Sequence, residues 1–325
     1  MTLSYALRLL SISLASFFLV HLALSILLTL SASQAIRLAG KLKPKRAGSL
    51  LFALRLLPTA ISCAVVLCVC IPSYLWLERP ASRESVGLPC LALALLGAAI
   101  CIFPLARVGK VLRDSNRFSK ACAENAREIQ TQSESFPVWA VPQESPLLAV
   151  SGMFKQRVFV SASVLRTLSH DELLAALCHE RAHRIWRDNL KRLLFLLTPR
   201  GVPFSPAPRR LERAWSKFNE WAADDLAVAG DARRAVSLAS ALVRVARLGS
   251  SSPHPIFISS LTDGCELSER VERLLCAAPC AEESGNAQVS LLFGPVLALA
   301  AFFAAYSFGP ACLLAAHEVL ERLIS

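Results

Sequence analysis

Long runs of apolar residues dominate the pattern of this sequence. Four of them approach or exceed the roughly 20 residues that a helix needs to cross a bilayer, at about 9–30, 56–77, 88–105 and 289–308. The first run could instead be a signal peptide, but it is longer than the apolar core of about 7–15 residues in such peptides, and further spans follow. The pattern therefore predicts an α-helical membrane protein with four transmembrane helices.

Between the third and fourth runs, residues 107–288 form a polar block of mixed periodicity. A charged, helical stretch at 107–130 is followed by strand-like pieces at 138–141, 147–151 and 157–161, where apolar positions alternate or cluster. Ser169, with Glu172 three residues later, is a capping box that starts a helix reaching about 197. Two more helices are expected at about 211–229 and, after the cap Asp231, to about 248. We expect an α+β domain.

These patterns divide the chain into three parts. Residues 1–106 would hold three transmembrane helices, residues 107–288 the α+β domain, and residues 289–325 the fourth transmembrane helix with a short amphipathic tail after Pro310 that lies on the outer surface.

Composition and charge refine this organisation. Hydrophobic residues make up 54% of the chain and charged residues only 18%, which excludes a disordered chain. The net charge of +11 is concentrated in the loops after the first and third runs. Such loops are cytoplasmic under the positive-inside rule, so the N-terminus lies outside and the α+β domain inside. This accounts for the basic excess without nucleic acid, and no nucleic-acid partner is expected.

The eleven cysteines indicate a reducing compartment, because an odd number cannot all pair and most lie in apolar runs. Cys276 and Cys280 could share a helix face, but no second pair completes a metal site.

The chemistry lies in the capped helix, which contains His179, Glu180 and His183 in the H-E-x-x-H pattern. Residues four apart lie one helical turn above each other, so both imidazoles can bind one Zn²⁺. The glutamate beside the first histidine can reach a metal-bound water without being a ligand. An accidental pattern on an exposed helix face is the alternative.

A zinc peptidase needs a third protein ligand. Trp186 and Asn189 occupy the positions where the metzincin extension has Gly and His, which excludes that class. Glu220 and Asp224, four apart in the next helix, remain: Glu220 as ligand and Asp224 as the partner that orients a ligand imidazole. Asp188 either orients an imidazole in the same way or pairs with Arg187.

The segments SASVLRTLSHDELLAALCHERAHRIWRDN (161–189) and NEWAADDLA (219–227) resemble the BlaR/MecR-type integral membrane zinc metallopeptidases. The resemblance covers nearly the whole chain, with three spans, a zinc domain and a fourth span. Its E-x-x-A-D motif corresponds to residues 220–224. Those receptors carry an outer penicillin-binding sensor, whose S-x-x-K, S-D-N and K-T-G set is missing from this sequence. The resemblance therefore implies a stand-alone form, with any sensor a separate protein.

The resemblance implies a zincin-like, gluzincin-type endopeptidase of the bacterial inner membrane with one Zn²⁺ per chain. Glu180 would be the catalytic base, and a cytoplasmic or membrane-proximal protein, typically a repressor, the substrate. The strand at 157–161 offers an edge for an extended substrate or is plain core sheet. The oxyanion-stabilising group is not identified, His254 being the candidate by residue type. Two alternatives stay open: a non-cleaving signal transducer or scaffold, and a membrane quality-control protease like HtpX.

Overall fold

The computed structural model describes residues 5–77, 87–129, 137–153, 156–202, 205–249, 258–260, 267–276 and 318. The predicted fourth span and nearly all of the amphipathic tail lie outside these residues, as does His254.

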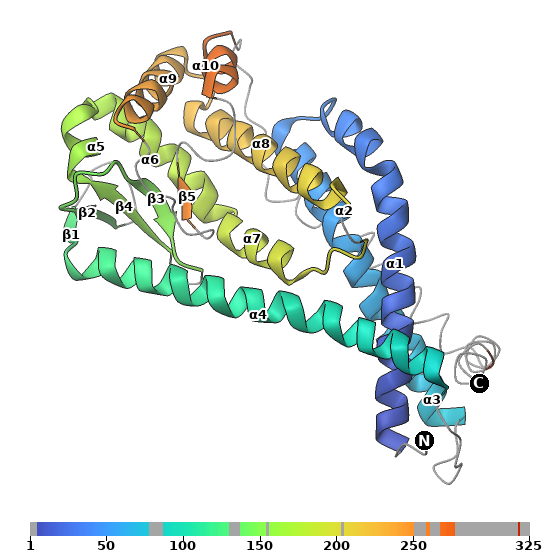
Figure 1. Cartoon of the computed structure of the whole chain (residues 1–325). Helices are drawn as coiled ribbons and strands as arrows, with labels where there is room; N and C mark the ends of the chain where they lie inside the picture. The colour runs from blue at the N-terminus through green and yellow to red at the C-terminus, as the bar shows by residue number, and fades with distance from the viewer. Residues whose placement is uncertain are drawn as a thin grey trace.

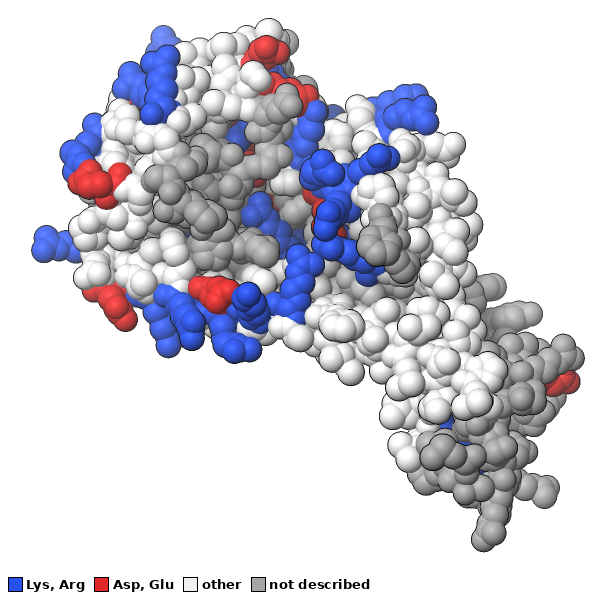
Figure 2. All heavy atoms as spheres, viewed as in Figure 1, with Lys and Arg blue, Asp and Glu red and all other residues white. Residues whose placement is uncertain are grey.

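Three helices in the described part of the chain are long and apolar enough to cross a membrane. The first is α1 (Tyr5–Ala39), and the second is α2 (Pro44–Val65), which continues through a π-helical turn (Val66–Cys70) into α3 (Ile71–Leu77). The third is α4 (Leu88–Glu124). Figure 1 shows α1, α3 and the start of α4 together at one end of the molecule. On the face shown in Figure 2, this narrow end is nearly without charged side chains, and Lys and Arg gather where the molecule widens.

Helix α4 joins the apolar end to the mixed domain without a break. Its first half is the apolar run, and its second half lies along the sheet, where Val111 and Cys122 are buried and the hydroxyls of Ser119 and Ser151 are 2.8 Å apart. The boundary expected after residue 106 thus falls inside one continuous helix (Figure 1).

The domain is built on a five-stranded sheet in the order β1-β2-β4-β3-β5. The strands are β1 (Arg127–Ile129), β2 (Val138–Val141), β3 (Leu148–Ser151), β4 (Arg157–Ser161) and β5 (Ile258–Ser260). Strand β4 pairs in parallel with β2 and antiparallel with β3, and β3 pairs antiparallel with β5. Both sides of β4 are therefore already paired, so of the two alternatives for residues 157–161 the substrate edge is wrong and the core sheet is right.

Six helices complete the described part of the domain. They are α5 (Ala162–Thr167), α6 (His170–Ile185), α7 (Asp188–Leu197), α8 (Ala207–Val228), α9 (Ala232–Arg247) and α10 (Leu267–Cys276). Leu177 of α6 and Leu238 and Leu242 of α9 pack with the valines of β3 and β4 in one buried apolar core. This core fixes α6 against β3, and with it the side chains that α6 presents to the interior.

The single helix expected from residue 170 to about 197 is in fact two. Arg187 adopts a left-handed conformation, with φ of 51°, and separates α6 from α7. A non-glycine residue rarely adopts this conformation, and the sequence around it contains no glycine or proline to indicate the break. The turn redirects the chain so that Asp188 faces back towards His183.

A second apolar cluster attaches α8 to the membrane-spanning helices. Leu51 and Phe52 of α2 pack with Leu211 and Trp215 of α8 and with residues of α1 and α7. Helices α2 and α8 approach each other closely at Gly48 of α2, where an added Cβ would lie 3.2 Å from Oδ1 of Asn219 in α8. Helix α8 is therefore held between the apolar end of the molecule and the interior of the domain.

The capping box of α6 generates a prediction about acid stability. Glu172 is 6% exposed, accepts the N–H of Ser169 at 2.8 Å and lies 3.1 Å from Nε of Arg244. Burial alone would raise the pKa of Glu172, but the hydrogen bonds from Ser240 and Ser169 and the charge of Arg244 lower it from its usual 4.5. A carboxylate with a lowered pKa stabilises the fold above its usual pKa, and this contribution is lost as the pH falls through the folded-state value.

We expect Glu172→Gln to lower the free energy of unfolding by about 1–2 kcal/mol at pH 7. The difference from wild type should shrink as the pH falls below 4.5. Thermal unfolding of the detergent-solubilised protein at several pH values measures this, with Glu144→Gln as a surface control, since the Glu144 side chain is 77% exposed. An equal difference at pH 7 and in acid would contradict the prediction.

Candidate metal centre

Helix α6 brings its three motif residues to the interior of the domain. His179, Glu180 and His183 are at most 2% exposed. Because the two histidines are four residues apart on one helix, their rings lie close, with Nε2 of His179 3.1 Å from Nε2 of His183. Two imidazole nitrogens this close to each other indicate that both bind the same metal ion.

Helix α8 supplies the third candidate ligand, Glu220, which is 1% exposed. Its Oε2 lies 3.3 Å from Nε2 of His179, and its Oε1 lies 3.6 Å from Nε2 of His183. Tetrahedral zinc with bonds of about 2.1 Å separates neighbouring ligand atoms by about 3.4 Å. The ligand atoms of His179, His183 and Glu220, all within 4.8 Å of one another, therefore match three corners of such a tetrahedron.

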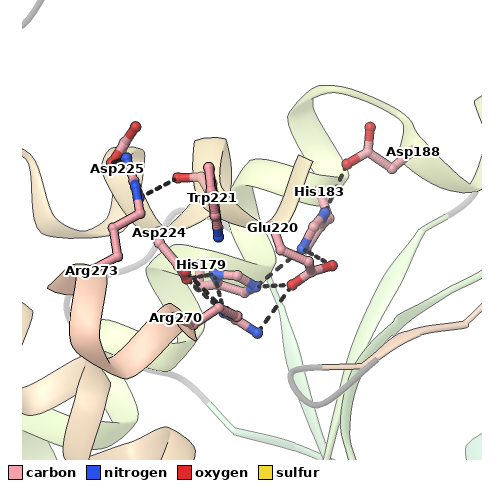
Figure 3. A network of polar contacts seen from close by, with 9 residues as sticks. All are labelled: His179, His183, Asp188, Glu220, Trp221, Asp224, Asp225, Arg270 and Arg273. Carbon is pink, nitrogen blue, oxygen red and sulfur yellow. Dashed lines mark hydrogen bonds and ion pairs between the residues drawn. The ribbon is translucent and has the colours of Figure 1, made fainter. Parts of the chain in front are cut away.

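Each imidazole is oriented by a buried carboxylate on its other nitrogen. Nδ1 of His179 lies 2.9 Å from Oδ1 of Asp224, and Nδ1 of His183 lies 2.7 Å from Oδ2 of Asp188 (Figure 3). A hydrogen bond from Nδ1–H to a carboxylate leaves the lone pair on Nε2, which is the form that binds a metal. The structure thus brings together the residues predicted from sequence: Glu180 and the ligands His179, His183 and Glu220, with Asp224 and Asp188 behind the imidazoles.

Asp188 does not pair with Arg187 in the way that the sequence left open. Its second oxygen, Oδ1, accepts a hydrogen bond from Nζ of Lys191 at 2.8 Å. Burial would raise the pKa of Asp188, but Lys191 and His183 outweigh it and hold the pKa at about 2. The carboxylate therefore stays ionised and can accept the hydrogen bond from Nδ1 of His183.

Glu180 lies between the histidines and the sheet. Its Oε2 accepts the backbone N–H of Val150 in β3 at 3.2 Å, whereas its Oε1 is buried without a hydrogen-bond partner in the described structure. Burial raises the pKa of Glu180 to about 7 against the opposing charges of the two histidines. A carboxyl group with this pKa can both accept and return a proton near neutral pH.

Asn189 supports the strand that holds Glu180. Its Nδ2 donates to the carbonyl oxygens of Val150 and Gly152, at 3.2 and 3.1 Å. In the sequence this residue served only to exclude the metzincin pattern. The structure shows that it fixes the end of β3 beside the site.

Arg270 of α10 enters the same cluster and was not anticipated from the sequence. It is 2% exposed, and it donates from Nε and Nη2 to the two oxygens of Asp224, at 2.9 and 2.6 Å (Figure 3). The available signal was weak: Arg270 and Arg273 lie three apart in a short amphipathic stretch, where arginines usually face solvent.

The charges of the site fit a metal ion. Burial lowers the pKa of His183, but Glu220 and Asp188 raise it overall to about 10, and the pKa of His179 is also raised by Asp224 and Glu220. Burial opposes ionisation of Glu220, yet His183 and His179 hold its pKa well below the usual value. The cluster thus stabilises positive charge at its centre, where two imidazoles and a carboxylate form the His₂Glu ligand set of zinc peptidases.

These pKa values predict that metal binding releases protons. His183, with a pKa of about 10, carries a proton at pH 7 in the metal-free site, and this proton must leave before Nε2 can bind a metal. Zinc binding at pH 7 should therefore release at least one proton, and the apparent affinity should rise about tenfold per pH unit for each proton released. Titration calorimetry in buffers of different ionisation enthalpy counts these protons. Zinc binding without proton release would contradict the assignment of His183.

The comparisons with known proteins agree with this geometry. No curated protein matches the sequence. The model of peptidase family M48 matches residues 113–274, which run from the second half of α4 to α10 and contain every residue of the centre. The described part of the chain also has three helices long and apolar enough to cross a membrane, which suggests a membrane-associated metallopeptidase. Residues 113–274 are thus similar to peptidase family M48, which supports a metallopeptidase.

Proposed function

We propose that this protein is a membrane-bound zinc endopeptidase that cleaves a cytoplasmic or membrane-proximal protein. The observation that carries the proposal is the placement of Glu180 beside three convergent ligand atoms from His179, His183 and Glu220. Zinc bound there would supply Lewis acidity, which makes water more acidic and polarises a peptide carbonyl.

The side chains of the protein would carry out the proton transfers. Glu180 is fixed by the N–H of Val150 through one oxygen, which leaves Oε1 to accept a proton from the attacking water. The same oxygen can then deliver the proton to the departing amine, because a pKa of about 7 suits both directions. Water and the peptide bond are consumed, and a carboxylate and an amine are released.

The packing of α8 supports a substrate close to the membrane. Glu220 lies on the same helix as Trp215, which packs against α2. Asn219, the residue before Glu220, also lies against Gly48 of α2, so the candidate ligand is adjacent to a membrane-spanning helix. Together with the basic loops, this favours a cytoplasmic domain of a bacterial inner-membrane protein, facing substrates at that surface.

Access to the site requires movement, because Glu180 and the three candidate ligands are almost completely buried. Strand β3, which holds Glu180, is paired with β4 on one side and β5 on the other. An extended substrate that bound by pairing with β3 would have to replace β5.

The resemblance to BlaR/MecR-type peptidases favours a repressor as substrate and a separate sensor protein as partner, but only the sequence motifs support this part of the proposal. Quality-control proteolysis uses the same chemistry, so only identification of the substrates would distinguish it from cleavage of a repressor. A non-cleaving scaffold is disfavoured because burial raises the pKa of Glu180 and its Oε1 has no hydrogen-bond partner in the described structure, a cost that a purely structural carboxyl group would not need to bear.

Glu180→Gln should separate metal binding from catalysis. The substitution keeps the shape of the side chain and removes the base, so zinc content should persist while the cleavage rate falls by at least about 10²–10⁴-fold. New N-termini generated in a proteome-derived peptide library, read by mass spectrometry, measure cleavage even while the natural substrate is unidentified. Glu128→Gln, an identical change at an exposed site on β1, is the matched control.

Glu220→Ala should instead lose zinc together with activity. Cleavage that persisted in Glu180→Gln, or that never appeared in the zinc-loaded wild type, would count against the endopeptidase proposal.

A further inference from the structure

Arg270 contacts three members of the metal centre at once. Besides the two hydrogen bonds to Asp224, its Nη1 lies 3.2 Å from Oε2 of Glu220, and its Nη2 lies 3.5 Å from Nδ1 of His179. These residues belong to α8 and α6, whereas Arg270 belongs to α10. The guanidinium of a residue on α10 therefore connects the part of the metal centre on α6 with the part on α8.

Arg270 does not only neutralise the negative charge of the carboxylates, because the geometry of its contacts also fixes their orientation. The planar guanidinium grips both oxygens of Asp224, which fixes the plane of that carboxylate. Oδ1 of Asp224 in turn holds Nδ1 of His179 at 2.9 Å. The orientation of the imidazole thus depends on a carboxylate that Arg270 holds in place.

The contact with Glu220 acts on a different ligand. Oε2 of Glu220 is buried, and it also lies 3.3 Å from Nε2 of His179. By attracting this oxygen, Arg270 limits rotation of the carboxylate between the two imidazoles. A lysine at this position could supply charge, but it lacks the fork that engages Asp224 and Glu220 together.

We propose that Arg270 is a positioning residue of the metal centre, which sets the orientation of His179 through Asp224 and that of Glu220 directly. This inference rests on the metal site of the proposed function and extends it to a residue of α10 that is not a ligand. Without Arg270, both ligands would keep their identity but lose their fixed geometry.

A purely structural role for Arg270, that of fastening α10 to α8, is the competing explanation. However, α10 has other attachments: Arg273 pairs with Asp225 at 2.5 Å, Glu269 pairs with Lys217 at 2.5 Å, and Leu274 is buried in the core. Arg273 also lies over the Trp221 ring. These contacts hold α10 on the surface of α8 independently of Arg270.

The pair Arg270 and Arg273 therefore offers a matched experiment on one helix. Arg270→Met, Arg270→Lys and Arg273→Met would be made in the full chain in detergent. Zinc affinity would be measured by competition with a chelator, and the ligand field by the visible d–d bands of the Co²⁺-loaded protein. Circular dichroism and thermal unfolding would establish that each variant is folded.

We expect Arg270→Met to weaken zinc binding by about 10–100-fold, the usual loss when a partner of a metal ligand is removed, and to change the Co²⁺ bands. Arg270→Lys should recover part of the affinity, and it tests the proposal even if Arg270→Met does not fold. Arg273→Met should retain wild-type affinity and bands, although its unfolding temperature falls.

Unchanged affinity and Co²⁺ bands in the folded Arg270 variants would overturn the inference and leave the proposed function intact. An equal loss in Arg273→Met would also overturn it, since α10 docking alone would then account for the effect. Failure of the wild-type protein to bind zinc or Co²⁺ would instead overturn the proposed function on which the inference rests.

Discussion

Ionisable side chains that are buried inside an apolar domain must be paired with one another, and the structure depends on this pairing. Seven such residues are at most 2% exposed and lie in one network: His179, Glu180, His183, Asp188, Glu220, Asp224 and Arg270. Removing a charge from water costs several kcal/mol unless it is paired. The carboxylate oxygens of this network therefore face imidazoles, the Arg270 guanidinium, the Lys191 ammonium or the N–H of Val150. Among the described residues, Oε1 of Glu180 has neither a hydrogen-bond nor an ion-pair partner. This atom belongs to the residue that the proposed mechanism uses as the base.

This requirement explains why the site is assembled from elements far apart in the chain. Helix α6 provides the imidazoles and Glu180, α7 provides Asp188, and α8 provides Glu220 and Asp224. Strand β3 provides the N–H that fixes Glu180, and α10 provides the guanidinium. The apolar core beneath α6 and the cluster that joins α8 to α1 and α2 hold these elements in register. One face of α8 thus carries Glu220, and another packs on the membrane-spanning helices.

Much of the fold could be predicted from the sequence, where the signals are local. The bounds of β2 and β4, the capping box of α6 and the four-residue spacings at His179 and Glu220 follow from periodicity and helix geometry. The match to an M48 model supports the metallopeptidase expectation but not the finer resemblance to BlaR/MecR-type receptors.

What could not be predicted depends on tertiary contacts. Arg187 takes a left-handed conformation without glycine, because the fold requires Asp188 to reach His183. Whether β4 is an edge depends on which strands flank it, and its parallel partner β2 is not its neighbour along the chain, because β3 lies between them in sequence. Arg270 resembles any other arginine of an amphipathic helix until α10 is placed against α8.

X-ray absorption spectroscopy at the zinc edge, on protein purified without chelators, tests the central claim most directly, namely that the buried cluster is a metal centre. We expect one zinc per chain, with the scattering pattern of two imidazoles and oxygen ligands at about 2.0–2.1 Å. Protein that holds no zinc even after zinc is offered, or zinc bound without imidazole ligands, would contradict the account.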